Sequence, residues 1–334
     1  MNRRQMFRAV LAPALVVGFG TACSEPHPPG TTDIVDPGAP ASATPTPAAT
    51  PSLPAAPLTG LPVSAAPVAG RQALAVPIRV TRSTTPAGLG SADLVYAEFA
   101  ESDTLHLTAV FQSRDATKIG PVTEIRPVDI RSLGVLRPFI GYAGGPPNFR
   151  SQFEESGLAG VTPGDDGKVF GSDHTSTAAL WKAAPKGGQP PSQVLDYGTA
   201  GTPLAGRDLV PARELTVAVP GGPPMVWRYD AQKSVWVSKV GTSTVTAASV
   251  MVLTMEYRTI DVKHPSPRSL PSAKVFGEGA AVAVSGPSGA KGRWRKPGQD
   301  LLCNVMDLGG ELLHPLPGNA WVVYVPTSAK VTIR

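Results

Sequence analysis

Short apolar and β-branched segments, separated by polar or Gly/Pro-containing stretches, recur along this chain, which is the pattern of β-strands joined by turns. In residues 92–100, Leu94, Tyr96 and Glu98 share one face, because successive side chains of a strand point to opposite sides. The polar residues 101–104 predict a hairpin turn into the next apolar segment. The strands expected in the first half are residues 73–80, 92–100, 105–113 and 138–143.

Three segments of the first half have features of helices rather than strands. Residues 129–136 have helical spacing of their apolar side chains. Asn148 is a suitable N-cap for a second helix, which Gly157 would end. Asp173 is a suitable cap for a third helix over residues 175–184. Strands and helices therefore mix in this half.

The second half is expected to be all-β, in a sandwich or barrel-like arrangement, because its short apolar segments are separated by Gly and Pro. The expected strands are residues 215–219, 225–229, 235–240, 249–257, 280–285, 292–296, 301–305 and 320–325. The fold class is therefore α+β, with a mixed α/β N-terminal domain over residues 57–205 and a β-rich C-terminal domain over 206–334. The boundary is placed where Gly, Pro and Thr cluster.

The first residues resemble an export signal that ends at a cysteine. Arginines precede an uncharged stretch over residues 9–22, which is shorter than the roughly 20 apolar residues that a membrane-spanning helix needs. Cys23 follows small residues, so we expect residues 1–22 to be a lipoprotein signal peptide and Cys23 to be lipidated. Gly20 stands where a lipobox usually has Leu, and an ordinary secretory signal is the alternative. Arg3-Arg4 is compatible with twin-arginine or with Sec export.

Residues 23–56 are expected to form a disordered tether behind the lipid. Residues 24–57 hold 10 of the 37 prolines and no aromatic residue, so they cannot bury enough apolar surface to offset chain entropy. The resulting prediction is a lipid-anchored protein on the extracytoplasmic face of the bacterial cell membrane.

The net charge of the chain bears on which kinds of partner it can bind. The chain has a net charge of +5, but three of its 30 basic residues lie in the signal, which leaves 27 against 25 acidic residues. A nearly neutral mature chain without a basic stripe argues against nucleic-acid binding. Cys303 is the second cysteine, so no intrachain disulfide is expected once Cys23 is acylated.

A set of motifs distributed over residues 57–326 is similar to a bacterial family. The motifs are Pro57-Leu58-Thr59-Gly60-Leu61-Pro62-Val63, Ala92-Asp93-Leu94-Val95-Tyr96, Ala109-Val110-Phe111-Gln112-Ser113, Lys118-Ile119-Gly120-Pro121-Val122, Arg126-Pro127, Ala143-Gly144-Gly145, Tyr229-Asp230, Gly292-Arg293-Trp294-Arg295-Lys296-Pro297-Gly298 and Leu316-Pro317-Gly318-Asn319-Ala320-Trp321. The chain resembles the YerB-like lipoproteins, which have two linked domains of unknown function. The resemblance implies an envelope location and no established activity. The chain departs from the family pattern at residues 102–106, at Thr123 and around His174.

Basic, acidic and glycine residues in the first domain form a candidate anion site. The anion-binding candidates are Arg126, Arg131, Gly144, Gly145, Arg150 and His174, and the candidate carboxylates are Asp93 and Glu98. An arginine at a helix start and a Gly-Gly loop supply donors for phosphate or carboxylate. The alternative is a structural ion pair between Arg126 and Asp93 with a Gly-Gly turn. No two histidines have metal-ligand spacing, so a zinc site is not expected. The carboxylates could hold a divalent metal against a bound phosphate, but no resident metal or other cofactor is expected.

Two functions remain open from the sequence. The first is a non-enzymatic envelope lipoprotein that binds or scaffolds a wall polymer or an envelope protein. The alternative is an enzyme acting on lipid-linked or cell-wall glycopolymers through the arginine and carboxylate cluster, by loose similarity to the LytR–CpsA–Psr phosphotransferases. Hydrolase motifs such as Gly-x-Ser-x-Gly are absent. The tryptophans at 227, 236, 294 and 321 belong either to a core or to a carbohydrate-binding surface.

Overall fold

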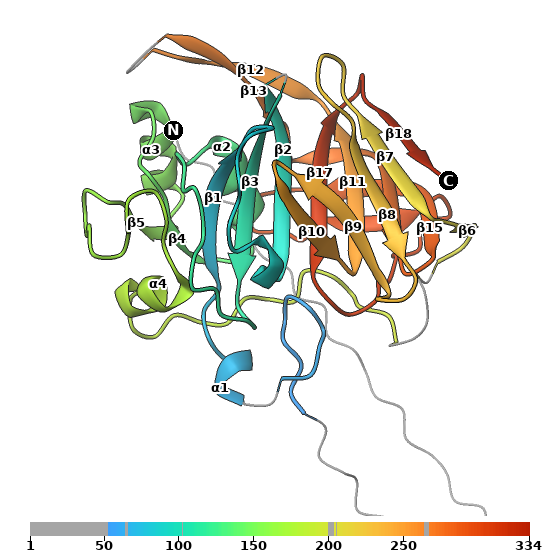
Figure 1. The fold of residues 1–334 in the computed structure, drawn as a ribbon, viewed down its shortest axis with the longest axis horizontal. Coiled ribbons are helices and arrows are strands. Elements are labelled where there is room, and N and C mark those ends of the chain that lie inside the picture. The colour runs from blue at the N-terminus through green and yellow to red at the C-terminus, as the bar shows by residue number, and fades with distance from the viewer. Residues whose placement is uncertain (1–52, 64–65, 102, 200–203, 205, 264–266) are drawn as a thin grey trace, which may run out of the picture. The chain divides into compact units, whose positions relative to one another are not determined.

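One large twisted sheet organises the structure, a computed structural model that describes residues 53–63, 66–101, 103–199, 204, 206–263 and 267–334. Its eleven strands come from both halves of the chain, as Figure 1 shows by colour. In spatial order the main path is β16 (Asn304–Asp307), β15 (Ser288–Lys296), β14 (Gly277–Ser285), β11 (Ser249–Met255), β17 (Ala320–Pro326), β2 (Leu94–Glu101), β3 (Thr104–Phe111), β1 (Leu74–Val80), β4 (Phe139–Gly141) and β5 (Ala159–Val161), with β6 (Val210–Pro211) beside β15. The predicted α+β fold class, with a β-rich C-terminal part, is confirmed.

The centre of this sheet joins the two halves of the sequence. Strand β17 lies between β2 and β11 and is parallel to both, with Ala320 opposite Leu94 and Ser249. The other pairs of the C-terminal side, β11–β14 and β14–β15, are antiparallel. The predicted boundary near residue 205 therefore separates two stretches of chain that contribute strands to a single sheet.

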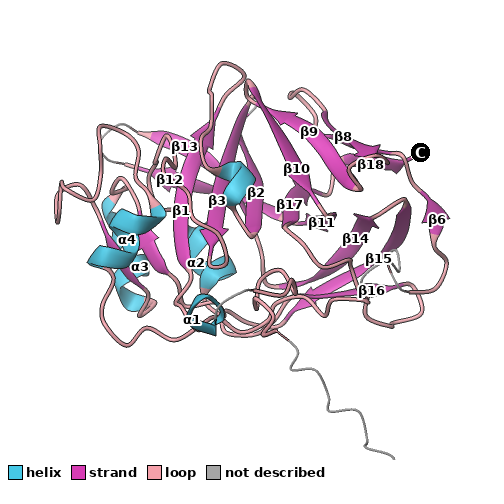
Figure 2. Cartoon of the chain, turned by 60° about the horizontal axis from the view of Figure 1, so that its bottom comes forward, coloured by secondary structure: helices cyan, strands magenta, loops and turns pink. Residues whose placement is uncertain are grey.

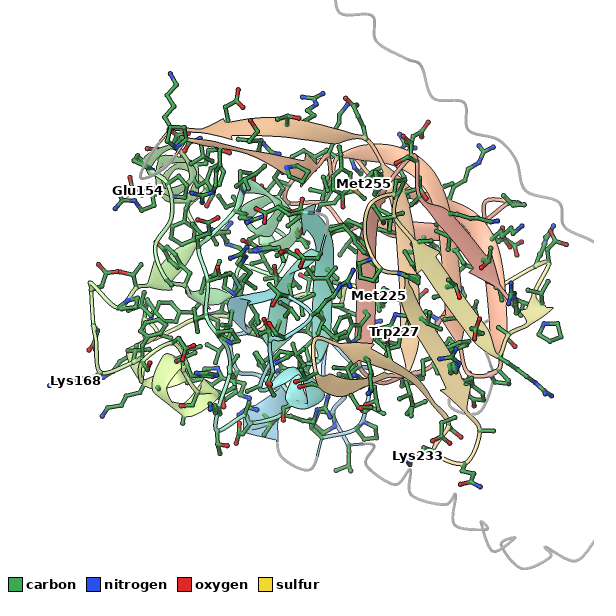
Figure 3. All side chains as sticks on the ribbon, turned by 45° about the horizontal axis from the view of Figure 1, so that its top comes forward. Glu154, Lys168, Met225, Trp227, Lys233 and Met255 are labelled. Carbon is green, nitrogen blue, oxygen red and sulfur yellow. The ribbon has the colours of Figure 1, made fainter. Side chains whose placement is uncertain are left out.

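A second sheet covers one face of the first and makes this part a sandwich. It consists of β10 (Ser243–Ala247), β9 (Val235–Val240), β8 (Met225–Asp230), β7 (Glu214–Ala218) and β18 (Lys330–Ile333). Apolar side chains of both sheets fill the space between them, with Trp227 against Trp321 at 5.1 Å between ring centroids. Figure 3 shows Trp227 and Met225 inside the molecule, whereas Lys168 and Lys233 project from its surface.

The four tryptophans named above belong to the core. All four are at most 1% exposed, which removes the alternative of a tryptophan-lined carbohydrate surface. Burying such large rings contributes substantially to folding, because each removes an extended apolar area from water.

The opposite face of the large sheet carries the helices and a separate ribbon. Helices α2 (Pro127–Leu133) and α3 (Pro147–Glu155) pack there with the two-stranded ribbon of β12 (Tyr257–Val262) and β13 (Arg268–Ala273). Helix α4 (Thr177–Ala183) packs through Leu180 on the first face, and α1 (Ala66–Ala69) is a single turn. Figure 2 shows α3 and α4 at one end of the molecule and β14–β16 at the other.

Several predicted element boundaries were wrong for local reasons. The N-cap of α3 is Pro146 rather than Asn148, and that of α4 is Ser176 rather than Asp173, with the Ser176 hydroxyl accepting from the Ala179 N–H at 3.2 Å. The predicted strand 249–257 is two elements, because the chain leaves the large sheet at Glu256 and enters the ribbon.

The predicted signal peptide, Cys23 and most of the tether lie outside the described residues. The last residues assigned to the tether are structured: Ala56 is fully buried, and its N–H donates to the Leu61 carbonyl at 2.8 Å. No helix within the described ranges is long and apolar enough to cross a membrane.

Candidate functional site

The candidate site forms at the start of α2, where Arg126 is the N-cap residue. Pro127 suits the first helical position, because its missing N–H is not needed there and its φ is already helical. The Asp129 carboxylate reaches back to accept the Arg126 backbone N–H at 2.7 Å, as in a capping box. These local interactions fix the backbone of Arg126 against the end of the hairpin formed by β2 and β3.

Asp129 also holds a histidine in the interior. Both of its carboxylate oxygens lie within 3.0 Å of the His106 Nε2, and Thr108 donates to the same carboxylate. The side chains of His106 and Asp129 are 1% and 0% exposed. A hydrogen bond from Nε2–H to a carboxylate leaves Nδ1 of a neutral histidine as an acceptor, the arrangement that orients a general base.

Glu98 lies opposite His106 on the neighbouring strand. The two residues are register partners in the β2–β3 hairpin, which brings their Cβ atoms to roughly 5 Å. One Glu98 oxygen accepts the Ala273 N–H of the ribbon at 2.6 Å. Burial raises the pKa of Glu98 to about 8, and Asp129 adds to this, although the Ala273 N–H, Arg126 and Arg131 act in the opposite direction.

A chain of ion pairs ties Arg126 to the ribbon. Its Nη2 lies 3.3 Å from the Glu124 carboxylate, which also accepts from Arg268 of β13 at 2.8 Å. The Gly144-Gly145 loop lies against this segment, because the Ile125 N–H donates to the Gly144 carbonyl at 2.9 Å. The close approach that glycine permits is therefore to the backbone just before Arg126: a Cβ on Gly145 would lie 3.3 Å from the Ile125 carbonyl oxygen.

The group contains an unusual density of unpaired polar atoms. Among the described residues, nine buried side-chain nitrogen and oxygen atoms have no hydrogen-bond partner, and five belong here: Glu98 Oε2, His106 Nδ1, Arg126 Nε, Arg126 Nη1 and Ser272 Oγ. We call Glu98, His106, Arg126, Asp129 and Ser272 the polar cluster. Most buried polar groups in native proteins are satisfied by protein or by ordered water, so these five atoms are a place where water or a further polar group would bind.

Not every residue predicted from the sequence joins this cluster. Arg131, one turn along α2, is near it: desolvation and then Arg258 lower the pKa of Arg131, and Glu98 raises it. Arg150 is exposed on α3. The His174 Nδ1 lies 2.6 Å from the Asp173 carboxylate, and the His174 ring lies beside Gly120. Among the described residues, no hydrogen bond or ion pair joins His174 to Arg126.

Asp93 has a structural role near the start of β2. Its oxygens accept from the Gln112 and Ser113 backbone N–H groups at 2.6 and 2.7 Å and from the Ser113 hydroxyl at 2.5 Å. Burial raises its pKa, and these hydrogen bonds oppose the rise. The alternative of an Arg126–Asp93 pair is wrong, since Arg126 pairs with Glu124 and the cation nearest Asp93 is Arg114 at 3.9 Å.

Sequence reasoning missed His106, Asp129 and Ser272. A usable signal existed in the alternation, because Glu98, His106 and Thr108 are polar residues on the strand face that also carries Leu94 and Val110. No group of three or more potential metal-binding side chains occurs in the described part of the chain.

Comparisons with known proteins agree with this fold. Residues 58–185 match the family model described as a protein of unknown function (DUF3048) N-terminal domain. The crystal structure of the YerB protein from Bacillus subtilis superposes with a TM-score of 0.67 at 20% identity, over 83% of this chain and 99% of that chain. The resemblance to the YerB-like family is confirmed. No curated protein matches the chain. The YerB-like chain therefore has the fold of the YerB protein and an N-terminal domain that the family model describes as of unknown function.

Proposed function

We propose that this YerB-like chain is a non-enzymatic lipoprotein of the bacterial cell envelope that binds an oxygen-rich anionic group of an envelope ligand at the polar cluster. Phosphate and carboxylate are the groups that match arginine donors. A wall polymer or an envelope protein carrying such a group is the expected partner.

The unpaired atoms of the cluster carry this proposal. Arg126 is 5% exposed, and two of its guanidinium nitrogens have no partner among the described residues, although an arginine is always charged. An unpaired buried donor costs about 1–3 kcal/mol, and more for a charged group. A bound oxyanion would remove this cost, and Glu98 in its protonated form and Ser272 would supply further donors.

Binding should depend on Arg126. We expect Arg126→Ala to weaken the binding of phosphate or pyrophosphate by about 1.5–3 kcal/mol, or about 10- to 150-fold in Kd, the usual contribution of a hydrogen bond to a charged group. Titration calorimetry of the full chain measures the effect. Arg150→Ala is the matched control, because Arg150 is exposed on α3 and should leave the affinity unchanged. Equal affinities for both variants and the unaltered chain would contradict the proposal.

The envelope location rests on the N-terminal sequence. We expect Cys23→Ala to move the protein from the membrane fraction to the soluble fraction and to abolish the mass added by acylation, because the thiol is the attachment point. Intact-mass measurement of both fractions tests this. A Cys23→Ala protein that stays membrane-bound with an unchanged mass shift would show that the anchor is elsewhere.

A second candidate function is an enzyme of lipid-linked or cell-wall glycopolymers, such as a LytR–CpsA–Psr-like phosphotransferase. The observation that favours it is the His106–Asp129 pair, in which the carboxylate orients the imidazole as in a general base. Release of product from a lipid-linked pyrophosphate by the full chain, and its loss in His106→Gln, would distinguish catalysis from binding alone.

A further inference from the structure

A cavity lies next to the polar cluster on the same face of the large sheet. Its inner part, of about 30 Å³, is lined by side chains of β2, β11, β17 and α2, among them Leu94, Leu253 and Val322. An outer part of about 230 Å³ shares Val194, Leu302 and other walls with it. The two parts therefore adjoin at these shared walls, and we call them together the passage.

Three polar side chains of the inner part, Tyr324, Ser132 and Lys296, are hydrogen-bonded within the protein. The Tyr324 hydroxyl and the Ser132 hydroxyl hydrogen-bond at 2.9 Å. The Lys296 ammonium donates to the carbonyls of Gln299 at 3.2 Å and Leu301 at 2.5 Å. Burial raises the pKa of the Cys303 thiol to about 12, so it is uncharged at neutral pH. Apart from Tyr96, the remaining walls of the inner part are apolar, which suits hydrocarbon rather than a polar ligand.

The cavity and the polar cluster share structural elements. Tyr324 of β17 is the register partner of Glu98, and Tyr96 precedes Glu98 by two residues on the same strand face. Ser132 lies on α2 one turn after Asp129. A ligand with its polar end at the cluster would thus extend its other end along Tyr96 and Tyr324 into the cavity.

The mouth of the passage is apolar as well. Leu302 and Leu312 line the outer part and are 38% and 37% exposed, and Leu301 beside them is 53% exposed. Gln193 and Asp196 stand at the polar rim. An apolar entrance with a polar rim is typical of sites that take the chain of an amphiphile.

Resting on the anion site proposed above, we propose that this cavity holds the apolar chain of the ligand, which is therefore an anionic amphiphile with a phosphate head and a hydrocarbon tail. Each methylene that leaves water for the cavity strengthens binding about fourfold. The tail would thus supply affinity that a free anion lacks.

Hexyl phosphate and inorganic phosphate are the probes that test the proposal. The full chain carrying Cys23→Ala, in detergent-free buffer, should bind hexyl phosphate at least about 50-fold more tightly than inorganic phosphate, as three or more methylenes enter the cavity. Equal affinity for the two probes would overturn the cavity proposal and leave the anion site standing. Failure of both probes to bind would overturn the anion site itself.

A tryptophan introduced into the shared wall of the two parts tests whether the tail occupies the cavity. Val194→Trp, at a half-buried wall position, should reduce the preference for hexyl phosphate at least about tenfold and leave the affinity for inorganic phosphate unchanged. Val210→Trp, at a 45% exposed position on β6 that does not line the cavity, should change neither affinity. A preference that survives Val194→Trp would overturn the proposed placement of the tail. Binding of hexyl phosphate that Arg126→Ala does not weaken would overturn the proposed placement of the head.

Discussion

Replacing Asp129 by alanine is expected to lower the free energy of unfolding by about 3–5 kcal/mol, the usual cost of breaking a buried ion pair or hydrogen-bonded network. The carboxylate serves three donors at once, from His106, Thr108 and the Arg126 backbone. Its loss leaves these buried groups unpaired and removes the cap of α2. Denaturant unfolding of the full chain, followed by circular dichroism, measures the change.

A second histidine–aspartate pair in the same chain is the control. His174 and Asp173 are 2.6 Å apart, but their side chains are 21% and 59% exposed. Water replaces the lost partner there, so Asp173→Ala should cost less than about 1 kcal/mol. Similar losses in both variants would show that burial is not what makes the Asp129 interactions important.

Replacing Glu98 by glutamine is expected to change how stability depends on pH. The pKa of Glu98 is about 8 in the folded chain against an ordinary value of 4.5. Between these values the folded state holds a proton that the unfolded state releases, so a rising pH destabilises the native protein. Over this interval Glu98 costs up to about 5 kcal/mol, at roughly 1.4 kcal/mol per pH unit.

The Glu98→Gln variant should lack this contribution, because its neutral amide can still accept the Ala273 N–H. We therefore expect the difference in unfolding free energy between variant and parent to grow in favour of the variant from pH 4.5 to pH 8. Glu101→Gln, on the exposed end of the same strand, is the control and should show no such trend. A pH-independent difference for Glu98→Gln would rule out the raised pKa.

The apolar and β-branched pattern of the sequence identified β1, β2 and β3, which are largely buried on both faces. It also placed Glu98 on the same face as Leu94 and Tyr96, as observed. It did not indicate that β11 and β12 belong to different sheets. Residues 249–257 contain no Gly or Pro, and beyond Glu256 the ribbon makes long-range contacts with β2 and α2, such as the Ala273 N–H bonded to Glu98.

The site was predictable only in part, because its members converge through the fold. Arg126 and the Gly144-Gly145 loop do lie together, since backbone hydrogen bonds join their segments. The sequence did not assign His106 to the site, because its partner Asp129 belongs to a helix that long-range packing brings to it. Arg150 was assigned to the site, but the rotation of α3 that buries Phe149 and Phe153 turns Arg150 outward.

The position of β17 in the large sheet determines when, during synthesis of the chain, strand β2 gains its second neighbour. Strand β2 belongs to the segment that matches the DUF3048 model, yet one of its two edges is paired only by residues 320–326. A growing chain therefore carries an unpaired, largely apolar strand edge until residues 320–324 have been synthesised. Because Tyr324 reaches the level of Glu98 only when β17 docks, the walls of the cavity and the surroundings of the polar cluster are incomplete until then.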